Sequence, residues 1–210
     1  MKQTQSAAKS TTPRRSGQAT RADIIEVATN LFYERGFHGT SMRDIADRIG
    51  IRPASIYNHV QSKEDLLHEV ALGSIQELLS GGQAVLAQHT TAADRLDAFV
   101  RAHVLYHARY RHRAKVSDDQ LHALSPEHLT EVLGVRDAYE GILKRILTQG
   151  KAEGGWQIAD VPVVAFAIAT MCTAVGIWFR EGGRVTAEQV ATIYSELALK
   201  AVQGQGELPH

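Results

Sequence analysis

Cysteine is almost absent from this sequence, which has one residue of this type, Cys172, among 210. A single thiol cannot form an intrachain disulfide, which argues against a disulfide-stapled secreted scaffold and favours a reducing cytoplasm. Cys172 lies in an apolar stretch, where its expected role is that of a small buried hydrophobe. Stability must then come from a hydrophobic core, and a hydrophobic content of 44% is sufficient for one.

The sequence also lacks an uninterrupted hydrophobic run. The longest apolar stretch, Val161 to Phe179, contains a proline, two threonines and a glycine, and charged residues bound it on both sides. This composition predicts a buried helix rather than a membrane span, so no membrane partner is expected. Residues 1–19 are basic but have no apolar segment of the kind that a secretory signal needs. They are predicted to form a disordered arm.

An excess of one charge is missing as well, because 23 Lys and Arg balance 23 Asp and Glu. Residues 1–65 hold ten basic and seven acidic residues, a net charge of +3, which leaves −3 for the remainder. This asymmetry favours an anionic partner at the N-terminal end, but a difference of this size is common by chance. Charge alone therefore argues neither for nor against nucleic acid.

Strand patterns, internal repeats and common catalytic motifs are absent too. No stretch alternates apolar and polar residues between hairpin turns, and there is no phosphate-binding glycine loop or GxSxG motif. We therefore predict an all-α protein that is not an enzyme. A small helical enzyme remains as an alternative hypothesis.

Helical periodicity and capping residues divide the chain into segments. Thr20 and Asp23 have the spacing of a capping box before a first helix that ends at Gly36, and Ser41 and Asp44 repeat this spacing before a second helix. The later predicted helices are Ala54 to His59, a segment from Ser62 to an interruption at Gly81-Gly82, and about 91–112, 126–153, 160–180 and 186–203, with a short turn near 118–124.

The second and third predicted helices have the form of a helix-turn-helix. Ile45 and Ala46 are expected to pack on the first helix, Gly50 permits the left-handed backbone of a sharp turn, and Ile56 should face inward. Short or amphipathic side chains remain that can enter a major groove: Ala54, Ser55, Tyr57, Asn58 and His59.

Phosphate contacts are expected from residues that flank these helices. Thr40, Ser41 and Arg43 lie at the start of the second helix, and Lys63 lies at the start of the fourth. Helix N-termini favour anions, so hydroxyls and cations are well placed there. The alternative is that Thr40, Ser41 and Lys63 are only caps and solvated surface.

Residues 21–67 resemble the DNA-binding domain of TetR-family regulators. The matching positions are Ala28, Leu31, Phe32, Gly36, Phe37, Thr40, Ser41, Ile45, Ala46, Gly50, Ile51, Ser55, Ile56, Tyr57, His59, Val60, Ser62, Lys63, Glu64, Asp65 and Leu66. Val60 stands where phenylalanine is usual. Arg52 replaces the usual small capping residue and is either a DNA contact or simply exposed.

The resemblance implies three parts: the basic arm at 1–19, a helix-turn-helix DNA-binding domain at 20–66 and a C-terminal ligand-binding and dimerisation domain at 67–210. It further implies a cytoplasmic repressor that binds a palindromic double-stranded DNA operator as a homodimer and releases it when a ligand binds the C-terminal bundle. The last two long helices are expected to form the dimer interface through Ala165, Ile168, Ala169, Val190, Ile193, Tyr194 and Leu197. Core burial within one protomer is the alternative for some of these residues.

The C-terminal part is similar to that of the KstR2-like branch of this family, which implies an acyl-CoA or a related lipid or steroid degradation intermediate as effector. Such an effector needs cations for its phosphates and an apolar tunnel for its acyl group. The candidate ligand-binding residues are Phe99, His103, Tyr106, His107, Arg109, Arg113, Arg136, Met171, Val175 and Trp178. A multidrug-type sensor with a promiscuous apolar pocket is the alternative.

Histidines raise a metal site as a competing idea, because His103 and His107 share a helix face and His112, His122 and His128 follow. No HExxH, CxxC or adjacent carboxylate pair supports it. No metal and no cofactor are therefore expected.

Overall fold

The computed structural model describes residues 19–203, which contain helices and no strand, so the all-α prediction is confirmed. The predicted N-terminal arm lies almost wholly outside the described residues. The elements are α1 (Arg21–Arg35), α2 (Met42–Ile49), α3 (Pro53–Ile56), α4 (Lys63–Gln88), α5 (Ala92–Arg109), α6 (Arg111–Asp119), the 3-10 turn η1 (Leu121–Ala123), α7 (Pro126–Ala152), α8 (Val161–Thr173), α9 (Val175–Trp178) and α10 (Ala187–Gln203).

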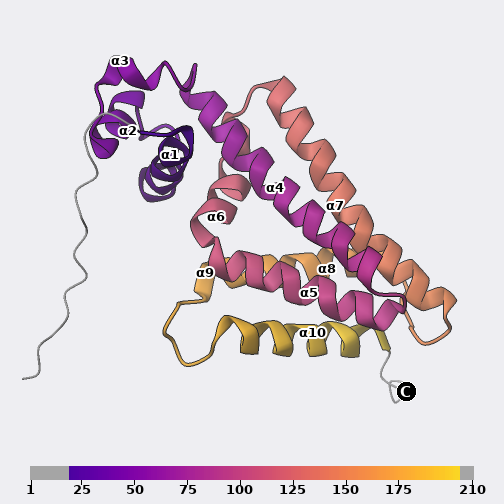
Figure 1. Ribbon diagram of the computed structural model, residues 1–210. Helices are drawn as coiled ribbons and strands as arrows, with labels where there is room; N and C mark the ends of the chain where they lie inside the picture. The colour runs from indigo at the N-terminus through magenta and orange to yellow at the C-terminus, as the bar shows by residue number, and fades with distance from the viewer. Residues whose placement is uncertain (1–18, 204–210) are drawn as a thin grey trace, which may run out of the picture.

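Helices α1, α2 and α3 form a small N-terminal head from which α4 leads into the rest of the molecule (Figure 1). Both predicted capping boxes are present, at Thr20 with Asp23 and at Ser41 with Asp44. Each box satisfies backbone N–H groups that a helix start leaves without partners. Gly50 has φ 81° and ψ 31°, the left-handed conformation that the turn between α2 and α3 requires.

The interruption predicted at Gly81-Gly82 is wrong, because α4 continues unbroken to Gln88. Gly82 is buried, and a Cβ atom there would lie 2.8 Å from Cδ1 of Ile142 on α7 and 3.3 Å from a ring carbon of Tyr139. The glycine therefore permits a close approach between two helices instead of ending one. Packing of this kind outweighs the cost of about 1 kcal/mol that glycine brings to a helix interior.

Two other predicted helices are each divided in the structure. The segment predicted at 91–112 breaks at Tyr110, where φ is −109° and ψ is 36°, and α6 turns away from α5 towards the head (Figure 1). The segment predicted at 160–180 breaks at Ala174, which separates α8 from α9. The first break matters for function because it lets α6 contact both α1 and α4.

The C-terminal bundle is built around α5, which packs against α4, α7, α8 and α10. Its core contains fully buried side chains from α5 and α7, namely Leu96, Ile142, Leu143, Ile146 and Leu147. Burying each such side chain contributes about 1.5–3 kcal/mol relative to leaving it exposed. Cys172 is 1% exposed, in agreement with its predicted role.

The stretch Val161–Trp178 has a mean hydropathy of 2.0 and is long and apolar enough to cross a membrane by composition alone. One such stretch is weak support for a membrane span. Here it is broken at Ala174, and several of its side chains line a cavity of the bundle. Other apolar side chains of this stretch are exposed on the surface of the protomer.

Candidate functional site

The head has a tightly packed interior beneath its outer surface. Ile45, Ala46 and Ile56 are all 0% exposed, as the helix-turn-helix pattern predicts, and they pack with Leu31 and Phe32 of α1. This interior fixes α3 relative to α1 and α2. A rigid support of this kind is what a DNA-reading helix needs.

The residues predicted to read the groove lie on the outer side of the head. Ala54, Tyr57 and Asn58 are exposed, with Tyr57 at 56%, and Ser55 and His59 are partly exposed. The helix itself is shorter than predicted, because α3 ends at Ile56 and the next three residues form turns. The whole set nevertheless flanks the buried Ile56.

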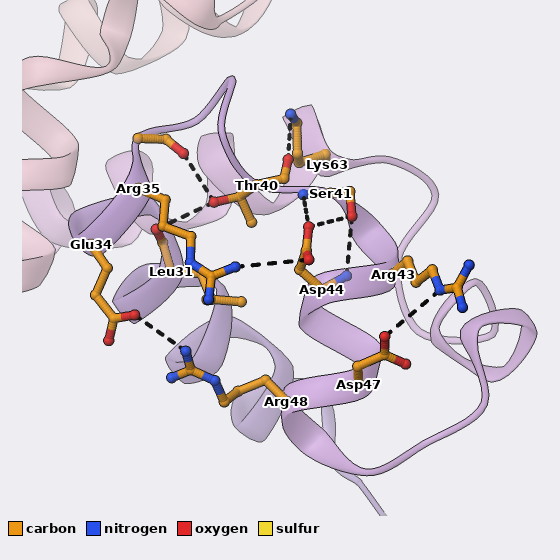
Figure 2. A network of polar contacts seen from close by, with 11 residues as sticks. Leu31, Glu34, Arg35, Thr40, Ser41, Arg43, Asp44, Asp47, Arg48 and Lys63 are labelled. Carbon is orange, nitrogen blue, oxygen red and sulfur yellow. Dashed lines mark hydrogen bonds and ion pairs between the residues drawn. The ribbon is translucent and has the colours of Figure 1, made fainter.

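Thr40 does not have the role that we predicted for it. Its side chain is buried, at 2% exposure, and its hydroxyl lies 2.9 Å from the Gly36 carbonyl oxygen and 3.3 Å from that of Leu31 (Figure 2). The expectation that this hydroxyl contacts phosphate is therefore corrected. It holds the α1–α2 loop together instead.

Lys63 is also engaged inside the protein. Its Nζ donates to the carbonyl oxygens of Phe37, at 2.8 Å, and Thr40, at 2.7 Å, and lies 4.1 Å from the centre of the Phe37 ring. Burial lowers the pKa of this ammonium group below its usual value. Lys63 thus fastens the start of α4 to the loop before α2 (Figure 2).

Two predicted phosphate contacts, Ser41 and Arg43, lie near the surface of the head, together with Arg52, the possible DNA contact. Ser41 is exposed but caps α2, where its hydroxyl accepts from the Asp44 N–H. The side chain of Arg43 is 82% exposed, and its Nε lies 3.7 Å from the Asp47 carboxylate (Figure 2). Arg52 is exposed and makes no side-chain capping bond at α3. The two arginines are therefore the cations with the greatest freedom to reach an anion.

The bundle contains a cavity of about 620 Å³ between α4, α5, α6, α7, α8 and α9. This volume lies within the range of small-molecule sites. Of the predicted ligand-binding residues, Phe99, His103, His107 and Arg136 line it. Two cations of α6, Arg111 and Lys115, line it too.

The other predicted ligand residues are engaged elsewhere. Tyr106 lies with its hydroxyl 2.6 Å from Ser74 Oγ, Arg113 pairs with Glu77 at 3.0 Å, and Arg109 pairs with Glu188 at 3.3 Å. Val175 is fully buried and Trp178 is 46% exposed, and neither borders the cavity, nor does Met171. None of these six residues lines the bundle cavity, so their assignment as ligand residues stays a prediction.

A polar group sits in the apolar wall of this cavity. His103 Nδ1 is 2.8 Å from the Tyr139 hydroxyl, and its Nε2 is 3.0 Å from the Thr173 hydroxyl. Burial, with a smaller effect of His107, lowers the pKa of His103 well below its usual value, so the ring is neutral. The sequence missed Tyr139 and Thr173, because their helices give no sign of facing His103 until α5, α7 and α8 are packed together.

Charged residues gather on the α6 and α7 side of the cavity. Arg136 pairs with Asp118 at 2.7 Å, and Arg111, Lys115 and Lys144 also border the space. Burial raises the pKa of the Asp118 carboxyl despite the nearby Arg136. The cavity therefore offers an apolar body with neutral polar groups such as His103. At its edge Arg136, Lys115 and Lys144 pair with the lining carboxylates of Asp118, Asp119 and Glu140.

Helix α6 connects this cavity to the head. Arg111 borders the cavity and donates to the Tyr33 hydroxyl on α1 at 3.1 Å. Next to it, His112 lies 2.9 Å from the Asn30 side-chain oxygen and stacks on the Tyr33 ring. Just beyond α6, the Gln120 side chain accepts from the Phe37 N–H at 3.2 Å.

The predicted dimer residues divide into two groups. Ala165, Ile168 and Val190 are 3%, 4% and 2% exposed, so they belong to the protomer core and the interface assignment for them is corrected. Ile193 and Leu197 on α10 are 49% and 48% exposed, and Ala169 and Tyr194 are partly buried. The sequence did not single out Val163 and Phe166 of α8, which are 64% and 73% exposed.

Comparison with known protein families gives two matches. The bacterial regulatory proteins of the tetR family match residues 24–70, and a family described as tetracyclin repressor-like, C-terminal domain, matches residues 89–202.

Individual proteins agree with these matches. The HTH-type transcriptional repressor KstR2 of Rhodococcus jostii is 29% identical over 182 residues, which cover 85% of this chain and 89% of that protein. The structure of the ketosteroid transcriptional regulator KstR2 of Mycobacterium tuberculosis superposes with a TM-score of 0.81 at 27% identity and covers 91% of this chain and 100% of that one. The structure of AibR in complex with isovaleryl coenzyme A and operator DNA gives a TM-score of 0.77 at 25% identity and covers 84% and 96%.

Proposed function

Because this chain belongs to the TetR family and is a transcriptional repressor of the kind that its KstR2 relatives are, we propose that it binds a palindromic operator as a homodimer and releases it when an acyl-CoA occupies the bundle cavity. The observation that carries this proposal is the double contact of α6, which borders the cavity and also holds α1 of the head.

The DNA-binding part rests on the outer surface of the head. Ala54, Ser55, Tyr57, Asn58 and His59 offer short and amphipathic side chains to base edges and thymine methyl groups. Arg43 and Arg52 supply free cations for phosphates. Ser41 contributes through the start of α2, where N–H groups and the helix dipole favour an anion.

The homodimer rests on the apolar face of α8, α9 and α10. Its exposed side chains are Val163, Phe166, Ile177, Trp178, Ile193 and Leu197. Side chains of this size would expose an apolar patch that a lone protomer rarely maintains. A twofold partner presenting the same face would bury it, and two heads would then read two half-sites.

An acyl-CoA fits the chemistry of the cavity. The acyl group requires an apolar space, which Phe99, Leu143 and Ala165 help to line. The CoA phosphates require cations, and Arg111 borders the cavity without an ion pair to any described residue. The AibR complex holds isovaleryl coenzyme A on the same fold. Arg111 Nε is buried without a hydrogen-bond partner among the described residues, and an anionic effector could satisfy this donor whereas an apolar drug could not. We therefore favour the acyl-CoA over a multidrug sensor.

Release of DNA requires the ligand to have different affinities for two arrangements of the head. An effector that moves α6 at Arg111 would act on the hydrogen bond from Arg111 to Tyr33. Because α6 also contacts α1 through His112, we expect α1 to move with α6. The family consists of regulators that are not enzymes, so binding rather than turnover is the expected readout.

The test measures operator binding by fluorescence anisotropy, using fragments selected from the host genome. We expect Tyr57→Ala to weaken binding at least about tenfold while helix content and dimerisation are unchanged, since a lost base contact costs about 1–3 kcal/mol. Acyl-CoAs of increasing chain length should release DNA, whereas free CoA and uncharged hydrophobic drugs should not. Release by drugs alone would favour the multidrug sensor, and unaltered binding by Tyr57→Ala would contradict the assignment of the reading surface.

A further inference from the structure

A second cluster of ionisable side chains lies outside both the reading surface and the ligand cavity. It forms where the first turn of α4 meets the first turn of α7, directly behind the head. Its members are Glu64, Asp65 and His68 of α4 and His128 and Glu131 of α7. The sequence separates the two halves by about sixty residues, which is why the histidines and the adjacent carboxylate pair are not recognisable as one group before folding.

We propose that Glu64, Asp65 and His128 bind a divalent transition-metal ion of the Zn²⁺ type. One ligand atom from each of the three lies within 4.8 Å of the others. Ligands at about 2.1 Å around a tetrahedral Zn²⁺ are about 3.4 Å apart, so side-chain shifts of about 1 Å close the site. One imidazole nitrogen and two carboxylates suit such an ion better than Ca²⁺ or Mg²⁺, which prefer oxygen ligands alone.

The donor atoms of Glu64, Asp65 and His128 are placed where they could bind an ion. Glu64 Oε1 accepts from the Ser125 N–H at 2.9 Å, and both Glu64 oxygens lie 2.8 Å from His128 Nδ1, so the proton on Nδ1 stands where the ion would bind. The Asp65 carboxylate makes no hydrogen bond or ion pair with any described residue. Asp65 and His68 also border a hollow of about 550 Å³ on the side of the cluster that faces Tyr57 and His59 of the head.

The electrostatic field at this point favours a positive charge. The N-termini of α4 and α7 each carry about half a positive elementary charge, and this charge opposes a cation. The carboxylates outweigh them, because Glu64, Asp65, Glu127 and Glu131 place four negative charges in the first two turns of these helices.

His68 fixes the orientation of the proposed nitrogen ligand. Its ring stacks on that of His128 with centroids 3.8 Å apart and 5° between the planes. Nε2 of His68 is 2.9 Å from the Glu131 carboxylate, although it does not have hydrogen-bond geometry. Oriented imidazoles of this kind lose less entropy when they bind a metal.

A metal ion here would tie α4 to α7 next to Lys63, which in turn holds the α1–α2 loop. The ion would thereby fix the angle at which the head leaves the bundle. This consequence for DNA rests on the proposed function, whereas binding of the ion does not.

The test uses full-length, tag-free protein stripped with EDTA and titrated with Zn²⁺ by calorimetry in the absence of DNA. We expect one ion per protomer at micromolar affinity or better, and a loss of at least about tenfold in both His128→Gln and Asp65→Asn. His89→Gln is the matched control, since its side chain lies at the far end of α4, and it should bind like the parent. Circular dichroism establishes that each variant is folded.

Two results would overturn the proposal. One is the lack of saturable Zn²⁺ binding, which would leave the cluster as an ion pair between Glu64 and His128. The other is binding that persists unchanged in His128→Gln and Asp65→Asn. Neither result affects the proposed operator binding, which is measured with metal-free protein.

Discussion

At the scale of single residues, the head is held together by side chains that satisfy its own backbone. Lys63 and Thr40 both bond to carbonyl groups around the α1–α2 loop, although their types and positions equally suit contacts with phosphate. Arg43, two positions from the Ser41 cap, is 82% exposed in the same region and is held only by a surface ion pair with Asp47. The two kinds of residue should respond differently to substitution.

We predict that Lys63→Ala lowers the free energy of unfolding by about 1–2 kcal/mol, because two carbonyls lose a charged donor. Arg43→Ala should change stability by less than about 0.5 kcal/mol, as is usual for an exposed side chain, but should weaken operator binding. Urea denaturation and anisotropy measure the two effects separately. If Lys63→Ala were as stable as the parent, the hydrogen bonds from Lys63 to the α1–α2 loop would not contribute to stability.

The buried His107 makes stability depend on pH. Burial, followed by the charge of Arg136, lowers the pKa of His107 from 6.5 to about 4. The unfolded chain therefore binds this proton more readily than the folded protein, so the contribution is present above pH 6.5 and is lost as the pH falls towards 4.

Between pH 7.5 and 5.0 this residue alone should cost about 2 kcal/mol of the free energy of unfolding. His107→Gln removes the titration and should reduce the pH dependence by that amount in urea denaturation at the two pH values. A variant with the same pH dependence as the parent would show that His107 is not buried in its neutral form.

At the scale of elements, Gly82 allows α4 and α7 to pack closely, and α6 is placed by the break at Tyr110. Within α7, Gly150 and Gly141 have opposite surroundings. A Cβ atom at Gly150 would lie 1.9 Å from a ring carbon of Trp156, while one at Gly141 would meet nothing within 4 Å.

We therefore predict that Gly150→Ala destabilises the protein by about 1–3 kcal/mol, because Trp156 must move, even though alanine is the better helix former. Gly141→Ala should stabilise it by about 0.5–1 kcal/mol, because alanine is the better helix former and its Cβ would meet no neighbouring atom there. Thermal unfolding compares the pair directly. If both variants were more stable than the parent, the close contact with Trp156 would be contradicted.

At the scale of the whole molecule, the proposed function requires a second protomer and the path through α6. Large apolar side chains of α8, α9 and α10 are exposed in the protomer, and Trp178 of α9 lies 6.5 Å from Tyr194 of α10 between ring centres. Phe166 and Ile177 of this set also border the bundle cavity, as does Arg111 of α6, so a bound effector would touch both the apolar face and the helix that holds the head.

Placing charge on this face should prevent association. We predict that Phe166→Asp and Ile193→Asp each convert a dimer into monomers at micromolar concentration, because burial of an unpaired carboxylate costs several kcal/mol. Leu133→Asp, at a residue of α7 that is 41% exposed, is the control and should remain dimeric. Light scattering after size-exclusion chromatography gives the mass. A parent protein that is itself monomeric would refute the proposed dimer.

The sequence by itself determined the head. The helix caps, the left-handed conformation of Gly50 and the burial of Ile56 depend on neighbours within a few residues. Such short-range patterns can be recognised in the sequence before the fold is known. The same was true of the all-α class, because apolar periodicity and the absence of strand patterns are local properties.

Only the tertiary structure decided how distant segments meet. It showed which apolar residues of α8 and α10 enter the core and which stay exposed, and that Thr40 and Lys63 bond internally. It also brought His103 to Tyr139 and His128 to Glu64. These outcomes depend on contacts between helices far apart in the chain, and periodicity marks an apolar side chain without saying which surface will cover it.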